Sequence, residues 1–181
     1  MEDSRIIEKV LQGEKDFFGV LMKKYFKEIF KYVYNVTNSY DISEDITQEI
    51  FIKIYNELSK YNIKKASFRT WIYRIAGNYT INYVKSKSYR NNQKTTLYED
   101  EFNNSEEDIV TDVIKDEKIS EINNIAVSLL SPKHYQMFSL HYFSNLNVKE
   151  ISESMNVPEK TIYKALKTSI EKIKKEVDFN E

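Results

Sequence analysis

The chain of 181 residues has 41% hydrophobic and 30% charged side chains, and its formal net charge is −1. This length fits one ordinary domain or two small ones, and the apolar content is sufficient for a core. Because the chain contains no cysteine, a disulfide framework and a thiolate metal site are excluded. The first residues show no apolar run flanked by basic residues, and no segment approaches the roughly 18 apolar residues of a membrane span. We expect a soluble, cytoplasmic protein without membrane insertion.

Turn-forming residues are rare in this sequence, which has three glycines and two prolines. All-β folds need such residues at short intervals, so their scarcity favours long helices. The near-zero net charge hides a division along the chain, because residues 91–118 have an excess of Asp and Glu while both flanks are basic. We therefore predict an all-α protein with two small helical domains, residues 1–90 and 119–178, joined by a flexible acidic linker over 91–118.

The first long helices of the N-terminal module are predicted from their apolar periodicity. Residues 14–36 repeat apolar side chains at helical spacing and predict a core helix. In the next segment, Asp41 followed by Glu44 looks like a capping box, which predicts a helix beginning near Ile42. One side of this second helix is an apolar stripe, made of Ile46, Ile50, Ile54 and Leu58.

The opposite side of the second helix carries Asp45, Glu49 and Ile52, with Gln48 at its edge. An isoleucine within an acidic and amide face is unusual for a surface that meets only water. From this segment alone, an ordinary solvated surface and a binding face are equally good interpretations.

The segment "FRTWIYRIAGN", residues 68–78, contains the only tryptophan and two of the four arginines of the chain. On a helical wheel Phe68, Trp71 and Ile75 take one side, which is typical of a core face. Arg74 and Asn78 take the other side together with Thr70, Ile81 and Lys85, and Arg69 and Tyr73 lie at the boundary. The pattern predicts one helix with a core-facing side and a polar, cationic side.

The C-terminal module divides into four predicted helices. Ser131 followed by Pro132 is a good N-cap with proline at the first helical position. A short helix after Asn147, the tight turn "NVPE" and a longer basic helix form the helix-turn-helix pattern. Lysines gather on the outer face of the last helix. Such a face is common on any exposed helix, but the short helix and turn before it favour DNA binding.

The sequence contains no arrangement typical of an enzyme. There is no glycine-rich phosphate loop and no H-E-x-x-H motif. His134 and His141 could share a helix face, but without cysteine or an acidic partner at ligand spacing they predict no metal site. Asp45 and Glu49 have no nearby nucleophile, so we do not assign them as acid and base. We expect no catalytic residue, no metal and no cofactor.

Three strings resemble a known family. "SEDITQEIFIKIY" looks like the clamp-binding helix of bacterial sigma factors, and "SFRTWIYRIAGN" looks like their promoter-melting segment. "LSPKHYQMFSLHYFSNLNVKEISESMNVPEKTIYKAL" resembles their C-terminal promoter-binding domain. The resemblance is to the extracytoplasmic-function (ECF) group of the sigma-70 family, and it covers nearly the whole chain apart from the linker.

The resemblance implies three binding surfaces, which correspond to regions 2 and 4 of the family. The clamp helices of the largest RNA polymerase subunit would be bound by Asp45, Gln48, Glu49 and Ile52. The −10 element, including an unstacked base of the non-template strand, would meet Phe68, Arg69, Thr70, Trp71, Arg74 and Asn78. The −35 element would be bound in its major groove by Lys160, Thr161, Tyr163, Lys164, Ala165, Lys167 and Thr168. The implied partners are core polymerase, including the flap of its second subunit, promoter DNA and an anti-sigma factor.

Two departures from the family pattern carry expectations of their own. The loop "YNIKKAS" before Phe68 has neither Gly nor Asp, which bears on base preference at the −10 element. The predicted recognition helix has no arginine, the commonest reader of guanine. We therefore expect the −35 element to be read less through guanine contacts and more through backbone charge and shape.

The leading interpretation is a promoter-selecting factor of RNA polymerase. Two other interpretations remain at this stage. One is a stand-alone helix-turn-helix regulator of duplex DNA, and the other is a helical adaptor that uses the Asp45 and Glu49 face. The Trp71 and Arg74 segment separates them, because a stand-alone regulator has no use for a single-strand surface in its first module.

Overall fold

The computed structural model describes residues 2–86 and 117–180, with side chains described as far as Val177. Within these ranges all regular secondary structure is helical. The predicted all-α fold of two helical domains is confirmed. The predicted acidic linker, residues 91–118, lies almost entirely outside the described residues. None of the described helices combines the length and apolarity that crossing a membrane requires.

The N-terminal module contains four α-helices and a short 3-10 turn. They are α1 (Asp3–Leu11), α2 (Phe17–Thr37), α3 (Tyr40–Glu57), the turn Leu58–Lys60 and α4 (Phe68–Lys85). The helix expected over 14–36 is α2, which begins three residues later. Helix α1 was not predicted, although its buried Ile6, Ile7 and Val10 recur at helical spacing.

The start of α3 differs from the predicted capping box. Ser39, in extended conformation, precedes the helix, and Asp41 lies exposed within the first turn. The carbonyl oxygen of Ser39 accepts hydrogen bonds from the backbone N–H of Ser43 at 3.1 Å and from its hydroxyl at 2.5 Å. The hydroxyls of Ser43 and Thr37 are 2.7 Å apart. Because these buried hydroxyls fix the junction with α2, the helix begins before Asp41.

The C-terminal module contains four helices, as expected: α7 (Glu117–Leu129), α8 (Pro132–Tyr142), α9 (Val148–Met155) and α10 (Glu159–Asn180). The side chain of Ser131 caps α8 by accepting from the N–H of His134 at 3.4 Å. Asn147 and Glu150 form a reciprocal capping box at the start of α9, with both hydrogen bonds at 2.9 Å. Asn156 ends α9 in the left-handed conformation, with φ 53°. The predicted helix–turn–helix elements are therefore present.

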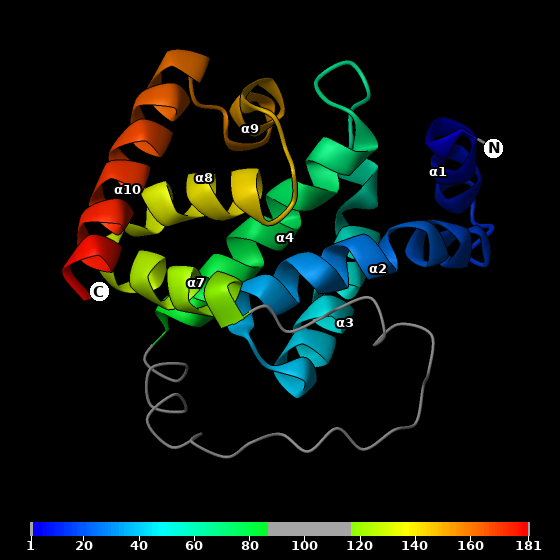
Figure 1. The fold of residues 1–181 in the computed structure, drawn as a ribbon. Helices are drawn as coiled ribbons and strands as arrows, with labels where there is room; N and C mark the ends of the chain where they lie inside the picture. Colours follow the sequence, from blue (N-terminus) through cyan, green and yellow to red (C-terminus); the bar gives the residue numbers. More distant parts are fainter. Residues whose placement is uncertain (1, 87–116, 181) are drawn as a thin grey trace.

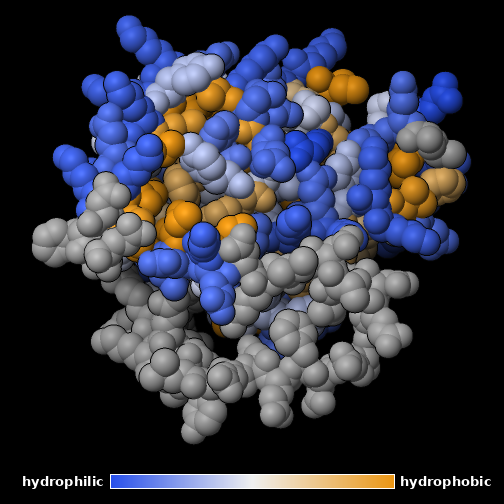
Figure 2. Space-filling view, in the orientation of Figure 1, coloured by the Kyte–Doolittle hydropathy of each residue, from blue (hydrophilic) through white to orange (hydrophobic). Residues whose placement is uncertain are grey.

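The two modules pack against each other around α4. Figure 1 shows α4 crossing the centre of the molecule, with α2 and α3 on one side and α8 and α9 on the other. Helix α7 lies beside α2, and α10 covers the far side of α8 and α9. In the same orientation most of the surface is hydrophilic, with hydrophobic patches between charged side chains (Figure 2). Helix α4 therefore packs against helices of both modules.

Burial around α4 is wider than the helical wheel predicted. Ile72 and Ala76, next in sequence to the expected core residues Trp71 and Ile75, are fully buried. Tyr73, expected at the boundary, is also fully buried, and Ile81 on the expected polar side is 4% exposed. The prediction that Ile81 and Thr70 share an outward face is wrong. The second module packs against much of that side of α4, and the Thr70 hydroxyl is held locally, 2.8 Å from that of Ser67.

The two faces of α3 allow a matched test of the packing. Ile50 is fully buried and Ile52 is 55% exposed on the same helix. Replacing Ile50 with Ala leaves a cavity, so we predict a loss of about 2–5 kcal/mol in the free energy of unfolding. The Ile52→Ala change should stay within about 0.5 kcal/mol. Urea denaturation followed by circular dichroism measures both values, and equal losses would contradict the assigned helix orientation.

Candidate functional site

The acidic face of α3 lies on the surface, as its sequence indicated. Asp45, Gln48, Glu49 and Ile52 are all exposed. On the same helix Ile46 is buried against the rest of the module. The face therefore presents two carboxylates, an amide and one apolar side chain that the described part of the chain leaves uncovered.

The loop before α4 is anchored by local hydrogen bonds. Asn62 accepts from the N–H of Lys64 through its side-chain oxygen at 2.9 Å and from the N–H of Lys65 through its backbone carbonyl at 3.0 Å. The hydroxyl of Tyr61 donates to the carbonyl of Ala66 at 3.2 Å. These bonds form a compact turn that places Lys64 and Lys65 at the surface, next to the N-terminus of α4.

The first turn of α4 holds the aromatic residues of the predicted −10 surface inside an aromatic cluster. Phe68 is 3% exposed and Trp71 is 6% exposed. The ring centroids of these two residues are 5.7 Å apart, and Tyr61 contacts both at 5.3 and 5.5 Å. Thr70 is 1% exposed, and its hydroxyl lies 2.8 Å from that of Ser67, the N-cap of α4. Phe68, Thr70 and Trp71 are thus buried in this arrangement.

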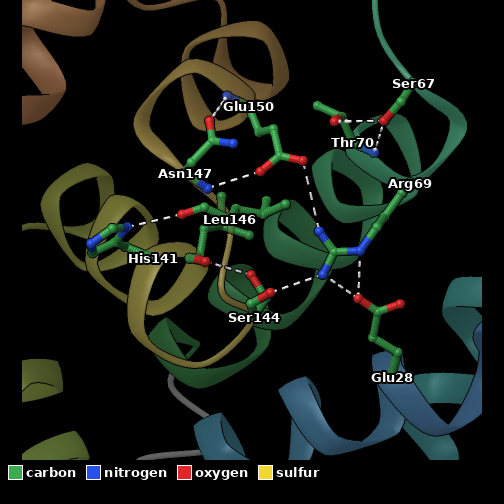
Figure 3. Close-up of polar contacts among 10 residues, drawn as sticks. Glu28, Ser67, Arg69, Thr70, His141, Ser144, Leu146, Asn147 and Glu150 are labelled. Atoms are coloured by element: carbon green, nitrogen blue, oxygen red, sulfur yellow. Dashed lines mark hydrogen bonds and ion pairs between the residues drawn. The ribbon is translucent and has the colours of Figure 1, made fainter.

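Arg69 joins three segments of the chain (Figure 3). Its Nε donates to Glu28 of α2 at 2.6 Å, and a terminal nitrogen donates to the same carboxylate. That terminal nitrogen also donates to the backbone carbonyl of Ser144 at 3.0 Å, and the other lies 3.8 Å from the carboxylate of Glu150. The guanidinium carbon sits 5.0 Å from the ring centroid of Tyr73. A planar guanidinium has donors for all these acceptors, which a lysine ammonium cannot reach together.

The electrostatic setting of Arg69 favours its charged form. Burial alone lowers the pKa of Arg69, but the hydrogen bonds and negative charge of Glu28 outweigh that effect, and the net pKa is raised. The same site raises the pKa of Tyr73, chiefly through burial and secondly through the charge of Glu28. The cation at this position is therefore permanent and held in one orientation.

The remaining polar residues of the predicted −10 surface point away from the core of the first module. Arg74 and Asn78 are exposed. The side-chain oxygen of Asn78 accepts a hydrogen bond from the amide of Gln136, on α8, at 2.7 Å. One of these two polar side chains is therefore in contact with the second module.

The predicted recognition helix is α10. Five of its seven predicted contact residues are exposed, with Tyr163 at 61%: they are Lys160, Thr161, Tyr163, Lys164 and Lys167. Thr168 is half-buried, and Ala165 is 3% exposed against the inner face. The helix offers three lysines and one aromatic side chain on a surface that the first module does not cover.

The partners of Arg69 and Asn78 were not found by sequence reasoning. Glu28 is 41 residues from Arg69 along the chain, Ser144 is 75 residues away, and Gln136 is 58 residues from Asn78. Such contacts leave no periodic signal in a single sequence. Glu150 was recognisable only as a charged residue in a short helix.

Comparison with protein families first defines the class of the protein. Residues 21–90 match the family described as sigma-70 region 2. Residues 113–177 match a family described as a putative helix-turn-helix protein, YlxM/p13-like. The first match contains α3 and α4 with both candidate surfaces, and the second contains the helix-turn-helix.

Similarity to individual proteins extends over nearly the whole chain. The chain is 28% identical to the ECF RNA polymerase sigma factor SigW of Bacillus subtilis, with 94% of each chain covered. It is also 28% identical to the ECF RNA polymerase sigma-E factor of Haemophilus influenzae, covering 90% of this chain and 88% of the relative. The chain is thus similar to ECF RNA polymerase sigma factors over nearly its whole length, and its residues 21–90 match sigma-70 region 2.

Solved structures share the fold at low sequence identity. CnrH, in a complex with the cytosolic domain of CnrY, superposes with a TM-score of 0.67 at 13% identity over 99% of both chains. The sigma factor RpoE from Bartonella quintana, in a complex with the anti-sigma factor NepR, gives a TM-score of 0.60 at 10% identity over 91% of this chain and 98% of RpoE.

The network around Arg69 predicts that lysine cannot replace it. Arg69→Lys keeps the charge but loses the fork that reaches Glu28 and Ser144 together. We expect the free energy of unfolding to fall by about 1–2 kcal/mol. The exposed Arg74→Lys is the matched control and should change it by less than about 0.5 kcal/mol. Urea titration distinguishes them, and a neutral Arg69→Lys would contradict the role of the fork.

Proposed function

We propose that this protein is an RNA polymerase sigma factor that binds core polymerase, recognises −10 and −35 promoter elements and promotes transcription initiation. The observation that carries the proposal is the exposed acidic face of α3, which includes the exposed Ile52. This face lies in the segment that matches sigma-70 region 2. The neighbouring helix α4 holds the cation of Arg69 in one orientation. A stand-alone regulator of duplex DNA needs neither feature.

The acidic face of α3 is proposed to bind the clamp helices of the largest polymerase subunit. Asp45 and Glu49 supply charges for basic partners, and Gln48 supplies an amide that both donates and accepts. Ile52 supplies apolar area that is stabilised by removal from water. Apolar area beside polar and charged groups is typical of protein interfaces.

The surface of α4 is proposed to receive the melted −10 strand. Arg74 is exposed on this surface, and Arg69 and Asn78 lie on the same helix. Arginine binds phosphates through two hydrogen bonds and stacks on unpaired bases, so it suits a single strand better than lysine does. Taking a base out of the stack costs a few kcal/mol. The aromatic cluster around Phe68 and Trp71 gives this helix a rigid base.

The outer face of α10 is proposed to enter the major groove at the −35 element. Its exposed lysines provide sequence-independent attraction to phosphates, and Tyr163 provides contact area. The described chain around this face offers no arginine for guanine, since Arg5, Arg69 and Arg74 all lie in the first module. Recognition through backbone charge and DNA shape follows from that composition.

Two further partners are proposed from the family. The flap of the second polymerase subunit is the proposed contact of the C-terminal module. An anti-sigma factor is the proposed regulator, a kind of partner that the structure of the similar RpoE contains.

Run-off transcription with purified core polymerase tests the function and the clamp surface together. We expect a promoter-dependent transcript with the native chain. Asp45→Ala with Glu49→Ala should weaken core binding at least about tenfold, or about 1.4 kcal/mol, and reduce the transcript. The control is Glu8→Ala with Glu121→Ala, which removes two exposed charges elsewhere. Absence of any transcript and of core binding would refute the sigma-factor proposal, and equal affinities would refute the clamp surface alone.

The salt dependence of duplex binding tests α10. Lys164→Ala should lower the slope of log affinity against log salt by about 1, because one phosphate contact is lost. Lys174→Ala removes the same charge from the same helix about 15 Å further along. Fluorescence anisotropy with a labelled duplex measures both slopes. Equal slopes would place the contact surface elsewhere.

A further inference from the structure

Asp3, in the first turn of α1, holds two side chains of α2. Its Oδ1 accepts from the ammonium of Lys24 at 2.6 Å, and its Oδ2 accepts from the hydroxyl of Tyr25 at 2.6 Å. The same ammonium lies 5.0 Å from the centroid of the Tyr25 ring. Both oxygens of one carboxylate are thus engaged, and hydrogen bonds to an ionised group are the strong kind. The proposed polymerase and DNA surfaces contain none of these three residues.

Tyr25 connects Asp3 to the start of α4. The side chain of Tyr25 is 6% exposed, and its ring packs edge-to-face with Phe68, with centroids 5.6 Å apart and planes at 68°. Such edge-to-face pairs contribute stability beyond the area that they bury. Because Asp3 binds the hydroxyl at the far end of the phenol, the ring is held both at its tip and by Phe68.

Phe68 also closes the loop before α4. Tyr61 stands before this loop and Phe68 after it, and their ring centroids are 5.3 Å apart. Tyr61 contacts Trp71 as well, at 5.5 Å. The loop between the two aromatic residues carries the exposed Lys64 and Lys65. Any movement of Phe68 therefore changes where the loop and its two lysines lie.

Helix α1 supports the same loop by a second route. It packs against the turn Leu58–Lys60, which ends directly before Tyr61. The pKa of Tyr61 is raised, chiefly by burial and secondly by the negative charge of Asp3. Burial and the hydrogen bond to Asp3 also raise the pKa of Tyr25. Both phenols therefore stay protonated, and Tyr25 remains a donor to the carboxylate.

Lys24 is the second group that Asp3 restrains. The side chain of Lys24 is 51% exposed and that of Asp3 is 21% exposed, so the pair meets water on its lysine side. Exposed ion pairs of this kind are weak and are screened by salt. The ammonium also lies beside the ring of Tyr25, which adjoins the first turn of α4. Removal of the carboxylate would therefore leave a cation available for phosphates next to the proposed strand surface.

We propose that Asp3 is a positioning residue for the recognition of the −10 strand. Through Tyr25 it fixes Phe68 and the loop before α4, and through Lys24 it keeps one cation away from the phosphates. Base preference then depends on a carboxylate of α1 that lies outside the proposed DNA surface. This inference rests on the proposed function for the identity of the strand, but the support of the loop does not.

The two contacts of Asp3 can be separated by substitution. A carboxylate that only joined α1 to α2 would change stability alone, whereas a positioning residue also changes how the strand is read. Tyr25→Phe removes the hydroxyl and keeps the pair of Asp3 with Lys24. Asp3→Asn keeps an acceptor for Tyr25 but removes the charge that holds Lys24. Glu8→Gln is the matched control, because it removes an exposed charge about 140° around the same helix.

The fluorescence of Trp71, the single tryptophan of the chain, tests the support of the loop without DNA. Tyr25→Phe should increase its quenching by acrylamide, because Tyr61 then covers Trp71 less tightly. Glu8→Gln should leave the quenching unchanged. Unchanged quenching in Tyr25→Phe would overturn the proposed support. If urea denaturation shows that Tyr25→Phe does not fold, Asp3→Ala breaks the same hydrogen bond from α1 and takes its place.

Strand discrimination is measured by fluorescence anisotropy on the complex with core polymerase. The probes are a preferred strand, selected by the native complex from single strands of about 12 random nucleotides, and a scrambled strand of the same composition. Tyr25→Phe should lower the ratio of the two affinities at least about threefold, because a hydrogen bond to a charged group is lost. Asp3→Ala with Tyr25→Phe should lower the ratio no further, since both changes break one bond. An unchanged ratio in Tyr25→Phe would overturn the positioning role.

The salt dependence of binding to the scrambled strand tests the restraint on Lys24 in the free protein. Asp3→Asn should steepen the slope of log affinity against log salt by about 0.7, the value for one more phosphate contact on a single strand. Adding Lys24→Gln should return the slope to that of the native chain, and Glu8→Gln should not change it. An unchanged slope in Asp3→Asn would overturn the restraint.

Failure of the proposed function has a different signature. A native chain that binds no core polymerase, or whose complex selects no strand, would refute the sigma-factor proposal and with it the role of Asp3 in reading the strand. The quenching of Trp71 would still decide whether Asp3 supports the loop.

Discussion

The structure depends on the burial of α4 from two sides. A helix in a small module ordinarily has one apolar stripe against the core and a polar face toward water. Here Phe68 and Trp71 pack against Tyr61 of the first module, while Gly77 lies against α8 of the second. Because helices of both modules pack against α4, its position fixes the relative placement of the modules. The polar contacts of Arg69 and Asn78 then set the orientation.

Much of the fold could be predicted because helix formation is local. The periodicity of residues 14–36 and the capping signals at Ser131 and Asn147 identified helices that the structure contains. The acidic face of α3 could also be predicted, since residues spaced three and four apart lie on one side of a helix. Helix α1 was missed although Ile6 and Val10 share that spacing, because its nine residues lie in a charged segment.

The docking of the modules could not be predicted, because it depends on pairs far apart in the sequence. Tyr32 and Ser139 are 107 residues apart, and Asn123 and Val36 are 87 residues apart. Neither pair belongs to a motif. The same limit explains the wrong expectation for Ile81, which was placed on an outward face because the wheel considers one helix alone. Thr70 was misplaced for a different reason, since its hydroxyl is held locally by Ser67.

The triple contact of Arg69 also has a genetic consequence. The side chains that restrain it, Glu28 and Glu150, come from α2 and α9, and neither belongs to the proposed DNA surface. Given the proposed role of Arg69 at the −10 strand, a selection for altered promoter opening should therefore also recover changes of Glu150 in the helix-turn-helix module. Such alleles would resemble changes in −35 recognition by their map position, yet their effect would persist on promoters that lack this element.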